Sequence, residues 1–143
     1  MGSRTSPARM GNEMSLTIVD TDILIDFAAE DERAARCLKQ REQVSTLAVS
    51  AITVMELMVG CRNKSELRKT ERLLERFEVI ALNEQASATA TELIREYRLS
   101  HGLLIPDALV AATALAANCD FVTKNQRDYR FIEGLKLLAF PTQ

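Results

Sequence analysis

The sequence predicts a single three-layer α/β/α domain built around a mainly parallel sheet of four or five strands. Two observations predict this fold class. Short apolar runs of strand length alternate with longer segments of helical character, which is typical of parallel sheets covered by helices on both faces. The 143 residues, 47% of them hydrophobic and 27% charged, suit one compact domain with a full core.

The domain is expected to occupy residues 15–143, and residues 1–14 are interpreted as a flexible leader or tag. That segment is polar and lacks the apolar region of a signal peptide. Strands are expected at the short apolar runs, which are residues 16–19, 46–50, 78–82, 120–123 and 135–140. Helices are expected at residues 23–29, 32–42, 52–61, 65–77, 84–99 and 106–118.

Individual residues support several of these helix boundaries. Ser50 is a suitable N-cap for the helix over residues 52–61. Pro106 suits the first turn of the last helix, because the N–H that proline lacks would have no partner there. His101 is expected in the loop between the last two helices.

Four acidic residues stand in or beside apolar segments, namely Asp20, Glu56, Asp107 and Asp128. A buried carboxylate is costly unless it is paired or binds a metal, so several in one chain suggest a shared cation. Oxygen ligands of this kind suit Mg²⁺ or Mn²⁺. In parallel α/β folds ligands bind beyond the carboxyl ends of the strands, which is where Asp20 lies. We therefore expect the four side chains to converge on one metal-binding rim.

Composition argues against several other classes of protein. The net charge is −2, so a nucleic acid would be contacted by a local basic patch and not by an overall positive field. The three cysteines are far apart and form no C-x-x-C pair, which predicts reduced thiols and a cytoplasmic protein. The single histidine excludes a ribonuclease that uses two histidines as acid and base. No apolar run approaches the roughly 20 residues that span a bilayer.

Four fragments occur in a characteristic order: VDTD at 19–22, SAITVMEL at 50–57, IPDALVAATA at 105–114 and VTKN at 122–125. Together they resemble the PIN-domain ribonucleases of the VapC toxin type, and the resemblance extends from about Leu16 to Phe140. It implies a PIN-like fold and a metal-dependent endoribonuclease that hydrolyses RNA phosphodiester bonds. Such proteins are usually the toxin of a toxin–antitoxin pair.

The resemblance also implies a set of site residues. Asp20, Glu56 and Asp107 correspond to the core acidic cluster of the family and are expected to bind Mg²⁺ or Mn²⁺. The fourth catalytic position falls at Asn125 or at Asp128, and both alternatives stay open here.

Other residues are expected to support the site. Thr21 and Thr123 would hold carboxylates or a substrate phosphate by hydrogen bonds, and Asp22 either caps the first helix or supports the site. RNA contacts are expected from the basic side chains near the rim, which are Lys124, Arg127, Arg130, Arg62 and Lys64.

The partners implied by the resemblance are a VapB-type antitoxin and a second copy of the chain. An apolar groove between the helices near Glu56 and Phe77 would suit a segment of the antitoxin. The homodimer interface would use residues 57–59 or the apolar face of residues 86–99, although core packing explains both stretches as well.

Two other functions are compatible with parts of the sequence. A PIN-like module that binds RNA or protein without cleaving it would have the same fold. A haloacid-dehalogenase-type phosphatase would use Asp20-Thr21-Asp22 as its D-x-D motif, with a covalent nucleophile. That alternative leaves Glu56 unexplained, and the chain contains no later Asp-Asp pair.

Overall fold

The computed structural model describes residues 15–140, and the predicted leader at 1–14 lies outside them. Within the described range five strands and six α-helices form the expected α/β fold. The strands are β1 (Ser15–Val19), β2 (Ser45–Ser50), β3 (Glu78–Ile80), β4 (Asp120–Val122) and β5 (Lys136–Leu138). The helices are α1 (Thr21–Ala28), α2 (Glu32–Glu42), α3 (Ala51–Val59), α4 (Lys64–Leu74), α5 (Glu84–His101) and α6 (Ile105–Ala117).

The sheet is parallel throughout, with the strand order β3-β2-β1-β4-β5. The first apolar run therefore forms the central strand, β1, between β2 and β4. Central parallel strands are covered on both faces, which explains why consecutive residues such as Ile18 and Val19 are both apolar and both fully buried. The predicted parallel sheet is confirmed, and the uncertain fifth strand is present at its edge.

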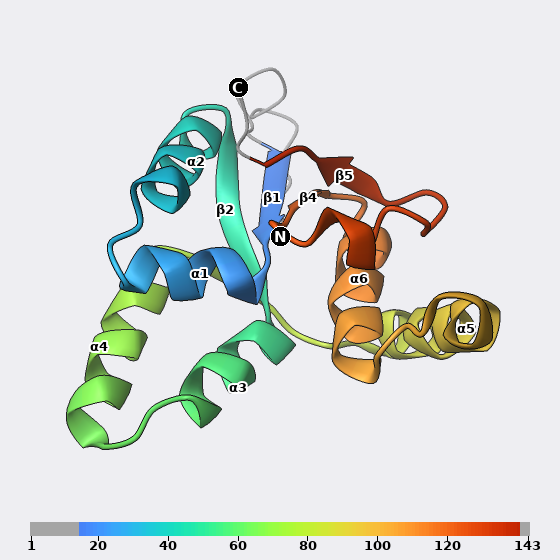
Figure 1. The fold of residues 1–143 in the computed structure, drawn as a ribbon, viewed down its shortest axis with the longest axis horizontal. Helices are drawn as coiled ribbons and strands as arrows, with labels where there is room; N and C mark the ends of the chain where they lie inside the picture. Colours follow the sequence, from blue (N-terminus) through green and yellow to red (C-terminus); the bar gives the residue numbers. More distant parts are fainter. Residues whose placement is uncertain (1–14, 141–143) are drawn as a thin grey trace.

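Helices cover both faces of the sheet, as Figure 1 shows. α5 and α6 lie on one side, and α1, α2 and α4 lie on the other. Because successive side chains of a strand point to opposite faces, neighbouring residues of β1 enter different cores. Ile18 packs in the cluster that includes Val110 and Phe121, whereas Val19 packs in the cluster that includes Leu38.

Helix ends follow the local capping chemistry. Ser50 caps α3 as predicted, and its hydroxyl accepts the backbone N–H of Thr53. α5 continues to His101 and stops where Gly102 takes a left-handed φ of 71°, a conformation that glycine adopts without steric cost. His101 thus belongs to the last turn of a helix, and the prediction that it lies in a loop was wrong.

Strand register brings two chain segments together at the carboxyl edge of the sheet. Val19 lies opposite Val122, and the N–H of Asp20 donates to the carbonyl oxygen of Val122 at 3.0 Å. Asp20 and Thr123, the residues that follow β1 and β4, are therefore neighbours. The first turns of α1, α3 and α6 lie at the same edge (Figure 1). Among the described helices, none has the length and hydropathy needed to cross a bilayer.

Candidate active site

Asp20 is the most deeply buried carboxylate in the described part of the chain, with 6% of its surface exposed. It lies at the point where β1 ends and serves as the N-cap of α1. Its Oδ1 accepts the backbone N–H of Thr21 at 2.8 Å, and its Oδ2 accepts the hydroxyl of Thr123 at 2.7 Å. Two hydrogen bonds from different segments therefore fix this carboxylate in position.

The segment after β4 holds a second carboxylate beside the first. The Thr123 hydroxyl lies 3.2 Å from Oδ2 of Asp22, and the backbone N–H of Lys124 donates to the same oxygen at 3.1 Å. A hydroxyl has one proton, so Thr123 donates to only one of the two carboxylates at a time. Asp20 takes the N-cap position of α1, and Asp22 is instead held by the residues that follow β4.

Glu56 reaches the site from α3 and is exposed. The Thr21 hydroxyl lies 2.6 Å from Oε1 of Glu56 and 3.0 Å from the Thr53 hydroxyl. Thr53 is itself buried and lies in the first turn of α3. The threonine next to Asp20 therefore links the first turn of α1 to α3 and holds Glu56 at the rim.

Asp107 comes from the opposite side, in the first turn of α6. It is half-buried, and its Oδ1 accepts the hydroxyl of Tyr129 at 3.0 Å. Tyr129 is almost fully buried and packs edge-on against Phe121, with the ring planes at 72°. Asp128 precedes Tyr129 at the end of a short 3₁₀ helix (Gln126–Asp128) and is exposed. A core aromatic residue thus orients the Asp107 carboxylate.

Burial raises the pKa of three of these carboxylates, those of Asp20, Asp22 and Asp107. Burial, and then the negative charges of Asp22 and Asp107, raise the pKa of Asp20 from 3.8 to about 7. Burial also raises the pKa of Asp22. The pKa of Asp107 is raised by burial first and then by repulsion from Asp128 and Glu56. Five carboxylates are therefore electrostatically coupled at one edge of the sheet, and a cation there would relieve their repulsion.

The donor set at this edge fits a hard divalent cation. The acidic side chains offer carboxylate oxygens as donor atoms, and Mg²⁺ and Mn²⁺ prefer oxygen ligands. Within residues 15–140, no group of three or more histidine, cysteine, Asp or Glu side chains is placed so that it could hold a metal ion. Mg²⁺ usually retains several waters and takes only one or two carboxylates, so an open rim with one buried member suits it.

Of the predicted RNA-contacting residues, Lys124 and Arg62 form ion pairs with acidic side chains, and Lys64 begins α4. Lys124 forms an ion pair with Asp26 of α1. Arg62 forms an ion pair of 2.8 Å with Glu66 of α4, the helix that begins at Lys64. Ion pairing reduces the positive charge that Lys124 and Arg62 offer to an RNA phosphate.

Arg127 has a different setting, because it lines a hollow of about 300 Å³ together with Asp107 and Asp128. Arg130, three residues further on, is exposed. Asn125 is also exposed, and its backbone N–H donates to the Thr123 hydroxyl at 3.0 Å. Of the two alternatives for the fourth position, Asp128 lines the same hollow as Asp107, and Asn125 does not.

Sequence reasoning missed two residues that position the site. No role was predicted for Tyr129, yet its hydroxyl contacts Asp107 across 22 sequence positions. Thr53 was also missed, although it stands three residues before Glu56 on the same helix face. A hydroxyl inside the otherwise apolar fragment at 50–57 was the available signal for Thr53, whereas Tyr129 stands in a polar stretch that carries no such signal.

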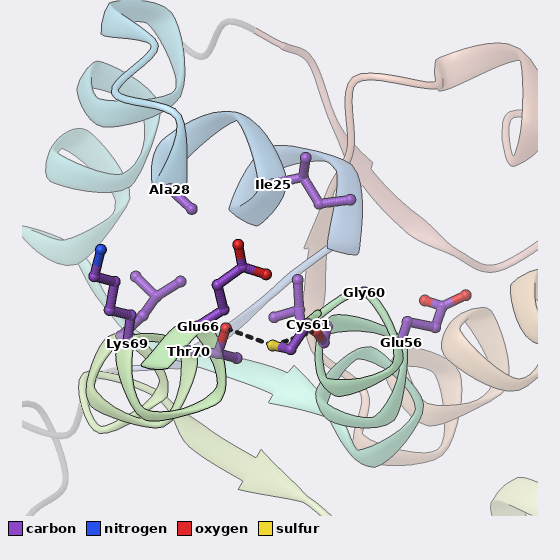
Figure 2. A pocket seen from close by; sticks show the side chains of 10 residues that line it. Ile25, Ala28, Glu56, Gly60, Cys61, Glu66, Lys69 and Thr70 are labelled. Atoms are coloured by element: carbon purple, nitrogen blue, oxygen red, sulfur yellow. Dashed lines mark hydrogen bonds between the residues drawn. The ribbon is translucent and has the colours of Figure 1, made fainter. Parts of the chain in front are cut away.

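A groove next to Glu56 separates α1, α3 and α4, and Figure 2 shows it from close by. It has a volume of about 600 Å³. Ile25 and Ala28 of α1 line it together with Leu57 of α3. Phe77, which the sequence placed near this groove, is buried in the core and does not line it.

Residues 17–133 match the family described as the PIN domain. The chain belongs to the PIN-domain family. This PIN domain is 32% identical to the ribonuclease VapC10 of Mycobacterium tuberculosis over 122 residues, which cover 85% of this chain and 91% of the relative. It is therefore of the VapC type, as the four sequence fragments predicted.

Solved structures give the same result for this PIN domain. The VapBC2 complex of Rickettsia felis, solved with a DNA fragment from its promoter, matches with a TM-score of 0.74 at 26% identity, over 85% of this chain and 96% of that chain. A toxin–antitoxin complex from Klebsiella pneumoniae matches with a TM-score of 0.71 at 28% identity, over 86% and 96%. The predicted PIN-like fold is confirmed over nearly the full length of those chains.

Proposed function

We propose that this PIN domain is an endoribonuclease that hydrolyses RNA phosphodiester bonds and depends on Mg²⁺ or Mn²⁺. The observation that carries the proposal is the buried carboxylate of Asp20, which lies among like charges and has its pKa raised to about 7. Such an arrangement costs stability, and its cost would be removed by a divalent cation. Membership of the family supports the reaction class, since the relative VapC10 is a ribonuclease.

Each acidic residue receives a role from its place in the site. Asp20 and Asp107 are the main metal ligands, and Glu56 binds the ion directly or orients the attacking water. When bound, the cation supplies an acidified water and positive charge for the phosphate oxygens. Thr21 keeps Glu56 at the rim through its 2.6 Å contact, and Thr123 keeps Asp20 in place.

We assign the fourth catalytic position to Asp128. Its negative charge contributes to the raised pKa of Asp107, which supports a place within the same electrostatic cluster. Asn125 has a supporting role through its backbone, because its N–H donates to the Thr123 hydroxyl that holds Asp20.

The protein is further proposed to act as a toxin neutralised by a VapB-type antitoxin in the cytoplasm. The solved complexes that it resembles include a toxin–antitoxin complex. Glu56 lines the groove between α1, α3 and α4, so an antitoxin segment that filled the groove would contact the acidic rim.

We also propose a homodimer. Met58 and Val59 at the end of α3 are exposed apolar residues, which favours that patch for the interface. The alternative patch, the apolar face of α5, is already buried against α6 through residues such as Ala90 and Leu93.

The nuclease proposal is tested with the purified protein after any bound partner has been removed. Total RNA is incubated with Mg²⁺, with Mn²⁺ or with EDTA, and cleavage by the wild type is compared with Asp20→Asn and Asp107→Asn. Glu92→Gln is the matched control, since it removes one negative charge from an exposed position of α5. Circular dichroism verifies that the variants are folded.

Cleavage that requires metal, survives in Glu92→Gln and disappears in both aspartate variants would establish the proposal. Equal cleavage by the wild type and the two aspartate variants would refute it. RNA binding without cleavage under every metal condition would favour the non-cleaving PIN-like module.

A further inference from the structure

The hollow beside the acidic rim is lined by several residues that have no role in the proposed hydrolysis. Asp107 and Asp128 line it on the side of the proposed active site. Its other walls carry an aromatic pair, His101 and Phe131, and the guanidinium of Arg127. The remaining lining residues are Gly102, Leu103 and Leu104.

The aromatic wall is a fixed and exposed platform. The rings of His101 and Phe131 are stacked, with centroids 4.1 Å apart and planes at 12°. Tyr97 packs edge-on against His101 at 5.9 Å, and Nδ1 of His101 lies 2.8 Å from the Ser100 hydroxyl. These contacts hold the imidazole in one orientation while His101 remains exposed. Rings held in this way are used by RNA-binding proteins to stack unpaired bases.

Arg127 gives the hollow a positive group that no acidic residue neutralises by direct contact. Between residues 15 and 140 its guanidinium forms no ion pair or hydrogen bond, in contrast with Lys124 and Arg62, which pair with Asp26 and Glu66. An unpaired guanidinium can bind a phosphate or the acceptor edge of a base in a planar, two-point contact.

We propose that this hollow binds one unpaired nucleobase of the RNA, that of a nucleotide next to the scissile phosphate. The base stacks on His101, and Arg127 contacts its edge or the adjoining phosphate. The volume of about 300 Å³ is at the small end of ligand pockets and suits one base. The inference rests on the proposed nuclease function and adds which residues contact a base beside the cut.

A fluorescence experiment tests base stacking without requiring cleavage. The chain contains no tryptophan, so His101→Trp introduces a single fluorophore at the platform, in an Asp20→Asn background that leaves the RNA intact. The matched control is Leu99→Trp, since Leu99 lies on the same helix and is 99% exposed. A random-sequence single-stranded RNA pool is added with Mg²⁺, and binding is followed independently by the anisotropy of labelled RNA.

Stacking predicts that the His101→Trp protein loses about half of its emission or more when RNA binds, whereas Leu99→Trp changes little. RNA that binds both proteins but quenches neither, or both equally, would overturn the inference and leave the nuclease proposal intact. If the wild type neither binds nor cleaves RNA, the proposed function fails and this inference fails with it.

The cleavage-site sequences provide a second readout. The wild type is expected to prefer particular bases at one position beside the cut, and His101→Ala to lower that preference by roughly tenfold. His101→Phe keeps the ring and should retain most of the preference, and Arg95→Ala on the outer face of α5 should leave it unchanged. An identical base preference in the wild type and His101→Ala would show that the hollow does not select a base.

Discussion

Four of the five carboxylates of the site fall into two groups that are held in different ways. Asp20 and Asp22 follow the central strand and share the Thr123 hydroxyl, so their positions are set by the sheet. Glu56 and Asp128 are exposed and stand on a helix and a 3₁₀ turn at the border of the site. Asp20 is buried and Asp22 is half-buried, whereas water screens the charges of the second group.

Because of this difference, the two groups should affect folding stability and RNA cleavage in different ways. Burying a carboxylate among like charges destabilises the metal-free protein, and the raised pKa of Asp20 reflects that cost. An exposed carboxylate has little effect on folding, because its hydration is largely retained. Substitutions in the buried group should therefore change activity and stability together, and those in the exposed group should change activity alone.

The largest effect is expected for Asp20→Asn, with opposite signs for the two properties. Cleavage should fall by roughly 10³-fold, because a central ligand loses its charge. The free energy of unfolding in EDTA at neutral pH should rise by about 1–3 kcal/mol, since a buried charge disappears while Asn can still accept the Thr21 N–H. Urea denaturation measures the second effect. A clear loss of stability would mean that the native carboxylate is better solvated than its burial indicates.

Glu56→Gln should lower cleavage by about 10²-fold and leave the free energy of unfolding within about 0.5 kcal/mol of the wild type. The amide oxygen of Gln can still accept the Thr21 hydroxyl, so only the charge is lost. Cleavage assays and urea denaturation on the same preparation check this pair of values. A stability change as large as that of Asp20→Asn would remove the distinction between the two groups.

Thr123→Val tests the hydroxyl that holds the buried group. Cleavage should fall by roughly 10- to 100-fold, as is usual when a residue that orients a metal ligand is removed. Stability should fall by about 1–2 kcal/mol, because the buried Asp20 carboxylate loses its hydroxyl donor. Thr123→Ser keeps the hydroxyl and is the matched control. Equal activity of the Val and Ser variants would show that the hydroxyl is dispensable.

A pH dependence of stability is also expected in the metal-free protein, and it has the same origin as the stability gain of Asp20→Asn. The folded-state pKa of Asp20 is about 7 against an ordinary value of 3.8, so between these values the folded chain binds more protons than the unfolded chain. The contribution of Asp20 to stability is therefore fully present below about pH 4 and is lost as the pH rises to 7, a total on the order of 1–3 kcal/mol.

Thermal melts in EDTA at several pH values, for the wild type and for Asp20→Asn, isolate this contribution. The stability advantage of the variant should shrink as the pH falls toward 4. An advantage that does not depend on pH would contradict the shifted pKa. Protons and metal compete for the same carboxylate, so Mg²⁺ affinity should increase as the pH rises from about 4 to 7.

The sequence by itself determined the fold class and the family. These properties depend on local patterns, because hydrophobic period, capping residues and short motifs are read within a few positions of one another. The proposal of Asp20 as a site residue needed only the sequence, since Asp20 ends an apolar run and the ends of parallel strands meet at one edge.

Only the tertiary structure decided how the side chains meet. Pairs such as Thr123 with Asp20 and Tyr129 with Asp107 are 103 and 22 positions apart, and no local pattern specifies which hydroxyl contacts which carboxylate. The aromatic platform at His101 was invisible for the same reason, because its partner, Phe131, lies 30 positions further along the chain. Such contacts depend on how helices pack on the sheet, and this packing results from the cores on both faces together.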